Sequence, residues 1–190
     1  AAGAMAAGLP RPDAPDTELL SALQQGRSRI IGGSVCSLAG CALLLWPLAA
    51  VGTWGEPVWA SLRLAALATW VLGFSMLALS AVVVVAAVWR DPADVPAPTL
   101  RLALDGAHLA TWSVSAPIGA VSVVATTVVA VQAGTCNAAV IVLAAAKVAT
   151  VLLELAGTGR RAGWNVGGWA AGSSGYVTVA WFAALLVALA

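Results

Sequence analysis

Charged side chains are scarce in this sequence, and their scarcity decides its class. Among 190 residues, 9% are Asp, Glu, Lys or Arg, and 61% are hydrophobic. Soluble domains carry about 25% charged residues, so a chain with so few cannot cover a water-soluble surface. The net charge is +1 and the chain has no basic run, which leaves nucleic-acid binding without support. The composition therefore predicts an integral membrane protein whose main partner is the lipid bilayer.

The groups that bind metals and cofactors are nearly absent as well. The single histidine, His108, cannot build a bis-histidine haem site, and no cluster of Cys, His, Asp and Glu has metal-ligand spacing. Cys36 and Cys41 lie about 140° apart around one predicted helix, so they cannot form a disulfide with each other. Residues 157–162 (GTGRRA) fit the spacing of a dinucleotide-binding loop, but they join two apolar runs rather than a strand and a helix. The sequence predicts no metal site, no cofactor and no catalytic residues.

Five long apolar runs dominate the rest of the chain. A helix needs about 17–25 apolar residues to cross about 30 Å of hydrocarbon, and helix is the state that satisfies the backbone there. We therefore expect an all-α membrane protein with a bundle of five transmembrane helices. The expected spans are residues 30–52, 64–89, 108–131, 138–155 and 167–190. A four-span alternative makes the fourth run re-entrant.

The polar N-terminal arm, residues 1–29, precedes the first run. Its first part is rich in Ala, Gly and Pro, and Met5 is expected to be the natural start. Asp16 then stands at an N-cap position, three leucines follow on one side, and Gly26 is expected to end the helix. This pattern predicts a short amphipathic helix on the membrane surface or against a partner. The first apolar run begins too late and is too long for a cleavable signal peptide.

Basic residues between the runs indicate the orientation. Seven lie on one predicted side: Arg11, Arg27, Arg29, Arg90, Arg101, Arg160 and Arg161. Arg63 alone lies on the opposite side. Because cytoplasmic loops carry the excess of basic residues, we expect the N-terminus on the cytoplasmic side and the C-terminus opposite.

The sequence has one lysine, and it stands in the middle of an apolar run. Lys147 lies near the centre of residues 138–155, close to the expected membrane midplane. A lysine at that depth costs about 2.5–3.5 kcal/mol, and the Val, Ile and Leu residues of the run offset about 3–5 kcal/mol. The helix is therefore expected to be marginal by itself and to insert as a hairpin with the third run.

Polar residues of these two runs can be drawn into one seam. Helical spacing places Lys147, Thr150 and Glu154 on one stripe, and counting back across the hairpin turn pairs them with two serines of the third run. The candidate seam comprises Lys147, Glu154, Thr150, Ser122 and Ser115. Pro117 is expected to free one backbone carbonyl nearby and to bend its helix. One interpretation is an ion or proton path, and the other is a buried structural pair.

A second, interfacial pair opens the third run. Asp105 and His108 are three residues apart and therefore lie on one helical face. Asp105 is expected to cap that helix, with His108 at headgroup depth. A structural interfacial histidine is the favoured interpretation, and a pigment or proton site is the alternative.

Small residues at four-residue spacing indicate where helices pack closely. The candidate packing positions are Gly32, Gly40, Gly168 and Gly172. A second ridge, with Gly33 and Ser37, runs beside the first. Trp70 and Trp181 are expected to lie deep and to face neighbouring helices. Chance matches in an Ala- and Gly-rich sequence are the alternative explanation for the ridges.

Taken together, short loops, packing ridges and few ionisable groups favour a structural or accessory subunit of a larger membrane protein assembly. The expected partners are other membrane protein subunits or further copies of the chain. The alternative is a small oligomeric transporter or channel component with Lys147 and Glu154 in its path. An enzyme ranks third, because membrane enzymes concentrate His, Asp or Glu near one interface.

Overall fold

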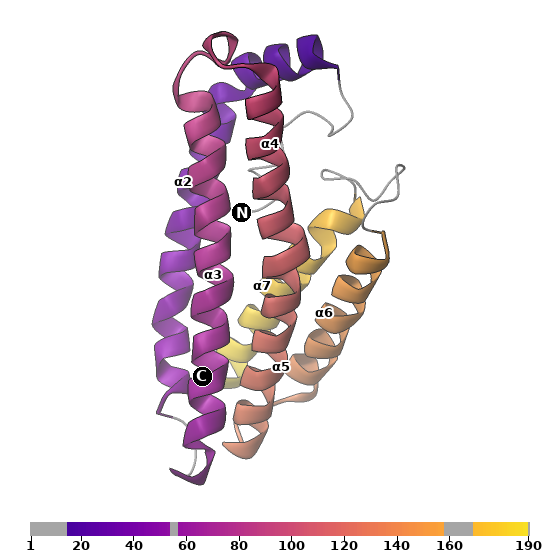
Figure 1. Ribbon diagram of the computed structural model, residues 1–190. Coiled ribbons are helices and arrows are strands. Elements are labelled where there is room, and N and C mark those ends of the chain that lie inside the picture. Colours follow the sequence, from indigo (N-terminus) through magenta and orange to yellow (C-terminus); the bar gives the residue numbers. More distant parts are fainter. Residues whose placement is uncertain (1–14, 54–56, 158–168, 190) are drawn as a thin grey trace.

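A computed structural model describes residues 15–53, 57–157 and 169–189 (Figure 1). Throughout these ranges the regular structure is helical, with no strand. The long helices are α2 (Asp16–Val51), α3 (Ala60–Trp89), α4 (Ala97–His108), α5 (Ala116–Gln132), α6 (Ala138–Gly157) and α7 (Trp169–Leu189). Three shorter segments join them: the 3-10 turns η1 (Pro57–Trp59) and η2 (Pro92–Asp94), and the π-helix η3 (Leu109–Ser115).

The helices form one bundle in which α3 occupies the centre of one half. It packs against α2 on one side and against α4, η3 and α5 on the other. The second half is the pair α6 and α7, and α6 also packs against α5. Figure 1 shows that α2, α3 and α4 extend beyond α6 and α7 at one end of the bundle.

The all-α membrane architecture expected from the sequence is confirmed. Within the described part of the chain, four helical segments are long and apolar enough to cross a membrane: Asp16–Val51, Pro57–Trp89, Ala97–Gln132 and Ala138–Ala156. The fifth helix, α7, contributes a shorter apolar stretch, Ser173–Leu189, which at 1.5 Å per residue covers about 25 Å. The chain is therefore a multi-pass helical bundle with four to five apolar helices.

Two helix boundaries differ from those that the sequence predicts. The N-terminal segment does not end at Gly26, because α2 runs without a break from Asp16 to Val51. A helical glycine costs about 1 kcal/mol, but Gly26 is buried in a packed face where a small residue fits. The third apolar helix likewise begins at Ala97 instead of 108, so Asp105 lies inside a helix and does not cap one.

The extended end of the bundle is built around an apolar cluster. This end cluster consists of Leu19, Leu23, Ile30, Val84, Val88, Leu100, Leu104 and Ala107, from α2, α3 and α4. Figure 1 shows the first part of α2 lying across this end, and the rest of the helix running along the bundle. The apolar side of the N-terminal segment is thus used inside the protein, which explains why the segment stays helical through Gly26.

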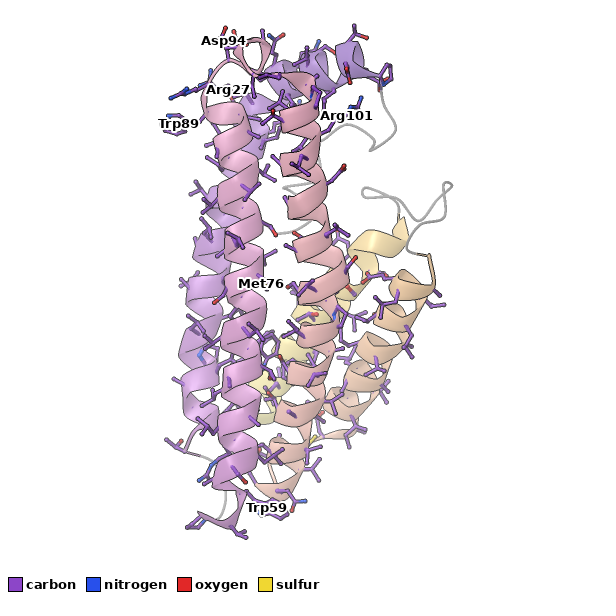
Figure 2. The ribbon with its side chains drawn as sticks, in the orientation of Figure 1. Arg27, Trp59, Met76, Trp89, Asp94 and Arg101 are labelled. Carbon is purple, nitrogen blue, oxygen red and sulfur yellow. The ribbon has the colours of Figure 1, made fainter. Side chains whose placement is uncertain are left out.

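Three polar contacts fasten the same segment. Arg101 Nη2 lies 2.7 Å from Asp16 Oδ1, Gln24 Nε2 donates to Asp91 Oδ1 at 3.1 Å, and Arg27 donates to the carbonyl oxygen of Trp89 at 2.5 Å. Hydrogen bonds from the backbone of Ala93 and from Gln24 hold the pKa of Asp91 below its ordinary value. Figure 2 shows Arg27, Trp89 and Arg101 at this end and Trp59 at the other.

Leu23→Ala should loosen this end far more than Asp16→Ala. Leu23 is fully buried in the end cluster, so its truncation leaves a cavity and should cost about 2–4 kcal/mol. Asp16 is exposed and its pair with Arg101 contributes at most about 1 kcal/mol. Limited proteolysis in detergent, read at the N-terminal segment, measures the difference. Equal cleavage of the two variants would mean that the polar contacts, and not the end cluster, hold the segment.

An aromatic cluster lies where α3, α5 and α7 meet, away from the extended end. Trp70 and Phe74 of α3 meet Trp181 and Phe182 of α7, and the rings of Trp70 and Trp181 stack with centroids 6.0 Å apart. The two indole N–H groups donate to threonines of α5, Trp70 to Thr126 at 2.9 Å and Trp181 to Thr127 at 3.0 Å. The prediction that Trp70 and Trp181 face neighbouring helices is confirmed, since both are buried.

Candidate functional site

The lysine of α6 is enclosed by the bundle. Lys147 is 4% exposed, and its Nζ donates to the backbone carbonyl oxygen of Ser174 on α7 at 3.2 Å. On the α5 side its stem passes Gly119, where a Cβ would lie 3.9 Å from Lys147 Cε. The ammonium group therefore lies between α5 and α7 and faces neither lipid nor bulk water.

Ser174 is the centre of a small polar contact. It is 2% exposed, and its carbonyl oxygen also accepts a hydrogen bond from Thr178 Oγ1 at 2.8 Å. Glu154 interacts with Ser174 and, electrostatically, with Lys147. Lys147 and Glu154 are seven residues apart, two turns of α6, so both side chains reach the same face of α7. We call Lys147, Glu154 and Ser174 the polar contact.

Two of the other residues expected in the seam keep their hydroxyl groups within their own helices. Thr150 donates to the carbonyl oxygen of Lys147 at 2.9 Å. Ser122 is buried on α5 and donates to the carbonyl oxygen of Ile118 at 2.8 Å. Both hydroxyl groups donate within their own helix, and the acceptor that Lys147 uses is the carbonyl oxygen of Ser174 on α7.

Ser115 lies against a different helix from the one expected. Its hydroxyl donates to the carbonyl oxygen of Gly73 on α3 at 3.2 Å, away from α6. Gly73 is buried, and a Cβ there would lie 3.4 Å from Ile118 Cγ2, so the two helices approach closely at this level. Ser115 therefore joins η3 to α3. Ser174 occupies the place beside Lys147 that was predicted for a serine of the third run.

The proline of this segment is accommodated by a change of helix type. Pro117 lies in the first turn of α5, directly after the π-helix Leu109–Ser115. Proline has no N–H and its ring clashes with the preceding turn, and a π-helical turn is wider than an α-helical one. The expected disturbance of the helix thus takes the form of a π segment.

Asp105 and His108 belong to α4, outside the polar contact. Asp105 is exposed and directly follows Leu104 of the end cluster. His108 is the last residue of α4, and its side chain lies outside the described part of the chain. Asp105 therefore contributes to the polar surface of the extended end.

The first glycine ridge faces outward. A Cβ at Gly32 or at Gly40 would meet nothing within 4 Å, so neither glycine allows a close approach inside this chain. Gly33 and Ser37, the parallel ridge, are buried instead. Gly168 lies outside the described residues, and so do the surroundings of Gly172.

Apolar packing closes the polar contact toward the turn between α5 and α6. Ala144 and Val140, one and two turns from Lys147 in that direction, are buried in the same apolar core as Trp181 and Phe182. The threonine hydroxyls at this level are engaged with the indoles of the aromatic cluster. Polar groups thus extend from Lys147 toward Glu154. On the other side of Lys147, toward the turn between α5 and α6, α6 is packed in the apolar core.

Among the residues that the structure describes, no group of three or more His, Cys, Asp and Glu side chains is placed to hold a metal ion. No protein-family model, curated protein or solved structure matches the chain.

Proposed function

We propose that this small multi-pass membrane protein is a structural or accessory subunit of a larger membrane protein assembly. The observation that carries the proposal is the enclosure of Lys147: it is 4% exposed and is hydrogen-bonded to Ser174 within the same chain. A lysine enclosed and hydrogen-bonded in this way serves as a structural part of the contact between α6 and α7, where its charge is satisfied within the chain.

The outer surface supports the same proposal. Large apolar side chains are exposed along every long helix, among them Leu43, Leu79, Leu102 and Leu152. Gly32 and Gly40 add a strip of small residues to the outer face of α2, with open space at both. Lipid or neighbouring subunits suit such a surface, and small residues permit close helix contact with the latter.

Affinity purification of the full chain in mild detergent tests the proposal. The expected result is one or more membrane proteins that co-purify with the wild-type chain in fixed ratio. A chain that purifies alone, or with copies of itself only, in several mild detergents would contradict the accessory role.

A specific observation also favours the alternative, a small oligomeric transporter or channel component. The polar contact joins a buried cation and a carboxylate between two apolar helices, and ionisable groups within membrane helices commonly mark ion and proton paths. Because Val140 and Ala144 close this contact on one side, a complete path requires a movement of α6 against α7 or a second copy of the chain.

For the orientation, we propose that the extended end of the bundle lies on the cytoplasmic side. An impermeant maleimide applied from outside should then modify Cys136, in the turn between α5 and α6, in a chain that carries Cys36→Ala and Cys41→Ala. Burial raises the pKa of the Cys136 thiol, so labelling should be slow at pH 7 and accelerate toward pH 9 and above, as the reactive thiolate forms. Ala93→Cys at the opposite end is the matched control. Outside labelling of residue 93, with Cys136 protected, would reverse the orientation.

A further inference from the structure

Three residues with buried hydroxyl groups follow the end cluster by one helical turn, on three segments of the bundle. Ile30 of α2, Val84 of α3 and Ala107 of α4 belong to that cluster. One helical turn from each of them, toward the aromatic cluster, stand Ser34, Ser80 and Thr111. Their relative exposures are 0%, 0% and 8%, so the layer is shielded from lipid. We call these three residues the hydroxyl layer.

The hydroxyl groups of the layer differ in what they donate to. Ser80 donates to the carbonyl oxygen of Met76 at 3.0 Å, and Thr111 donates to that of Ala107 at 2.9 Å. Each therefore keeps oxygen lone pairs that can accept a hydrogen bond. Ser34 is the exception, because its hydroxyl has no hydrogen-bond partner. A fully buried hydroxyl without a hydrogen-bond partner destabilises the folded protein, so we expect Ser34 to have a partner.

We propose that the hydroxyl layer binds water inside the bundle, with Ser34 as the donor and with Ser80 and Thr111 as acceptors. A buried water molecule makes about three hydrogen bonds to groups that would otherwise be unsatisfied, and one donor with two acceptors is the complement it needs. Thr111 belongs to the π-helix, and π turns offset backbone carbonyls that a water molecule can also contact. The ligand class is water, and the layer hydrates the junction between the extended end and the aromatic half of the bundle.

The same helix offers a matched control. Ser37 lies less than one turn beyond Ser34, is 1% exposed, and donates to the carbonyl oxygen of Gly33 at 2.8 Å. Ser37 lies beyond the layer, and its hydroxyl is satisfied within its own helix, so its removal should leave the water of the layer unchanged. Thr126 and Thr127 serve as internal references, because the indole N–H groups already occupy their oxygens.

Water-edited solid-state NMR on the full chain in lipid bilayers tests the proposal. Strong magnetisation transfer from water is expected at residues 34, 80 and 111, and weak transfer at residues 126 and 127. Ser34→Ala should abolish the transfer at residue 80 and lower Tm by about 2 °C or more, while Ser37→Ala should leave both unchanged. Thr111→Val keeps the shape of the side chain and should reduce the transfer at residue 34. This variant serves as the test if Ser34→Ala does not fold. Absence of water transfer at the layer in the wild-type protein, or a higher Tm for Ser34→Ala, would overturn the inference.

Discussion

Trp181→Ala should lower the free energy of unfolding by about 3–5 kcal/mol, the largest effect expected of any single truncation in this chain. Trp181 is completely buried, contacts Trp70 and Phe182, and donates to Thr127. Inside a membrane the loss comes from van der Waals packing and the aromatic contacts, because lipid is as apolar as the core. Unfolding by SDS titration in mixed micelles, followed by circular dichroism, measures it.

Trp89→Ala is the matched control for that experiment. Trp89 ends α3 and is 67% exposed, and Arg27 contacts its backbone oxygen, which the substitution keeps. Its removal should therefore change stability by at most about 0.5 kcal/mol. A Trp181→Ala protein as stable as Trp89→Ala would mean that α7 does not pack against α3 through the aromatic cluster.

Lys147→Met should insert and fold at least as well as the wild-type protein. Methionine keeps the long unbranched stem beside Gly119 and removes the cost of about 2.5–3.5 kcal/mol for a lysine at that depth. The lost hydrogen bond to Ser174 offsets about 1 kcal/mol or slightly more, so stability should stay level or rise by up to about 2 kcal/mol. The carbonyl of Ser174 keeps its bond from Thr178.

Glu154→Gln should lower the free energy of unfolding, in contrast to Lys147→Met. The substitution leaves Lys147 buried without its counter-charge, and breaking a buried pair from one side is strongly destabilising. Glu154 itself lies within one turn of the end of α6, where losing Lys147 costs less. Lys147→Met combined with Glu154→Gln should recover most of the loss. If Lys147→Met is the more damaging of the two single changes, the lysine contributes more than a contact between α6 and α7.

The sequence was sufficient to predict the helices but not which face of each helix points inward. The apolar runs predict helices that cross the membrane, because the backbone must satisfy its own hydrogen bonds in lipid. Lipid and core are both apolar, so no apolar stripe distinguishes the buried face. For this reason the ridge of Gly33 and Ser37 could not be told from that of Gly32 and Gly40 before the structure placed the first pair inward.

The polar contact could be predicted only in part. Lys147 and Glu154 stand out because charge is rare in an apolar run, and their shared face follows from their spacing. Their partner on α7 does not follow, because spacing within one helix says nothing about which other helix lies beside it. One signal was present: Ser174 and Thr178 are hydroxyl residues four apart in an otherwise apolar helix. Pairing α6 with α7 instead of with the third run alone would have turned that signal into a prediction.

We propose that Lys147 is a structural residue between α6 and α7 and conducts nothing. Reconstitution of the purified chain alone into liposomes tests this proposal, with proton, alkali-cation and chloride flux measured for the wild-type protein and for Lys147→Met. Both proteins are expected to insert fully, and neither should give flux above that of empty liposomes. Flux from the wild-type protein that is lost in a correctly inserted Lys147→Met protein would contradict the proposal and would establish the polar contact as part of a transport path.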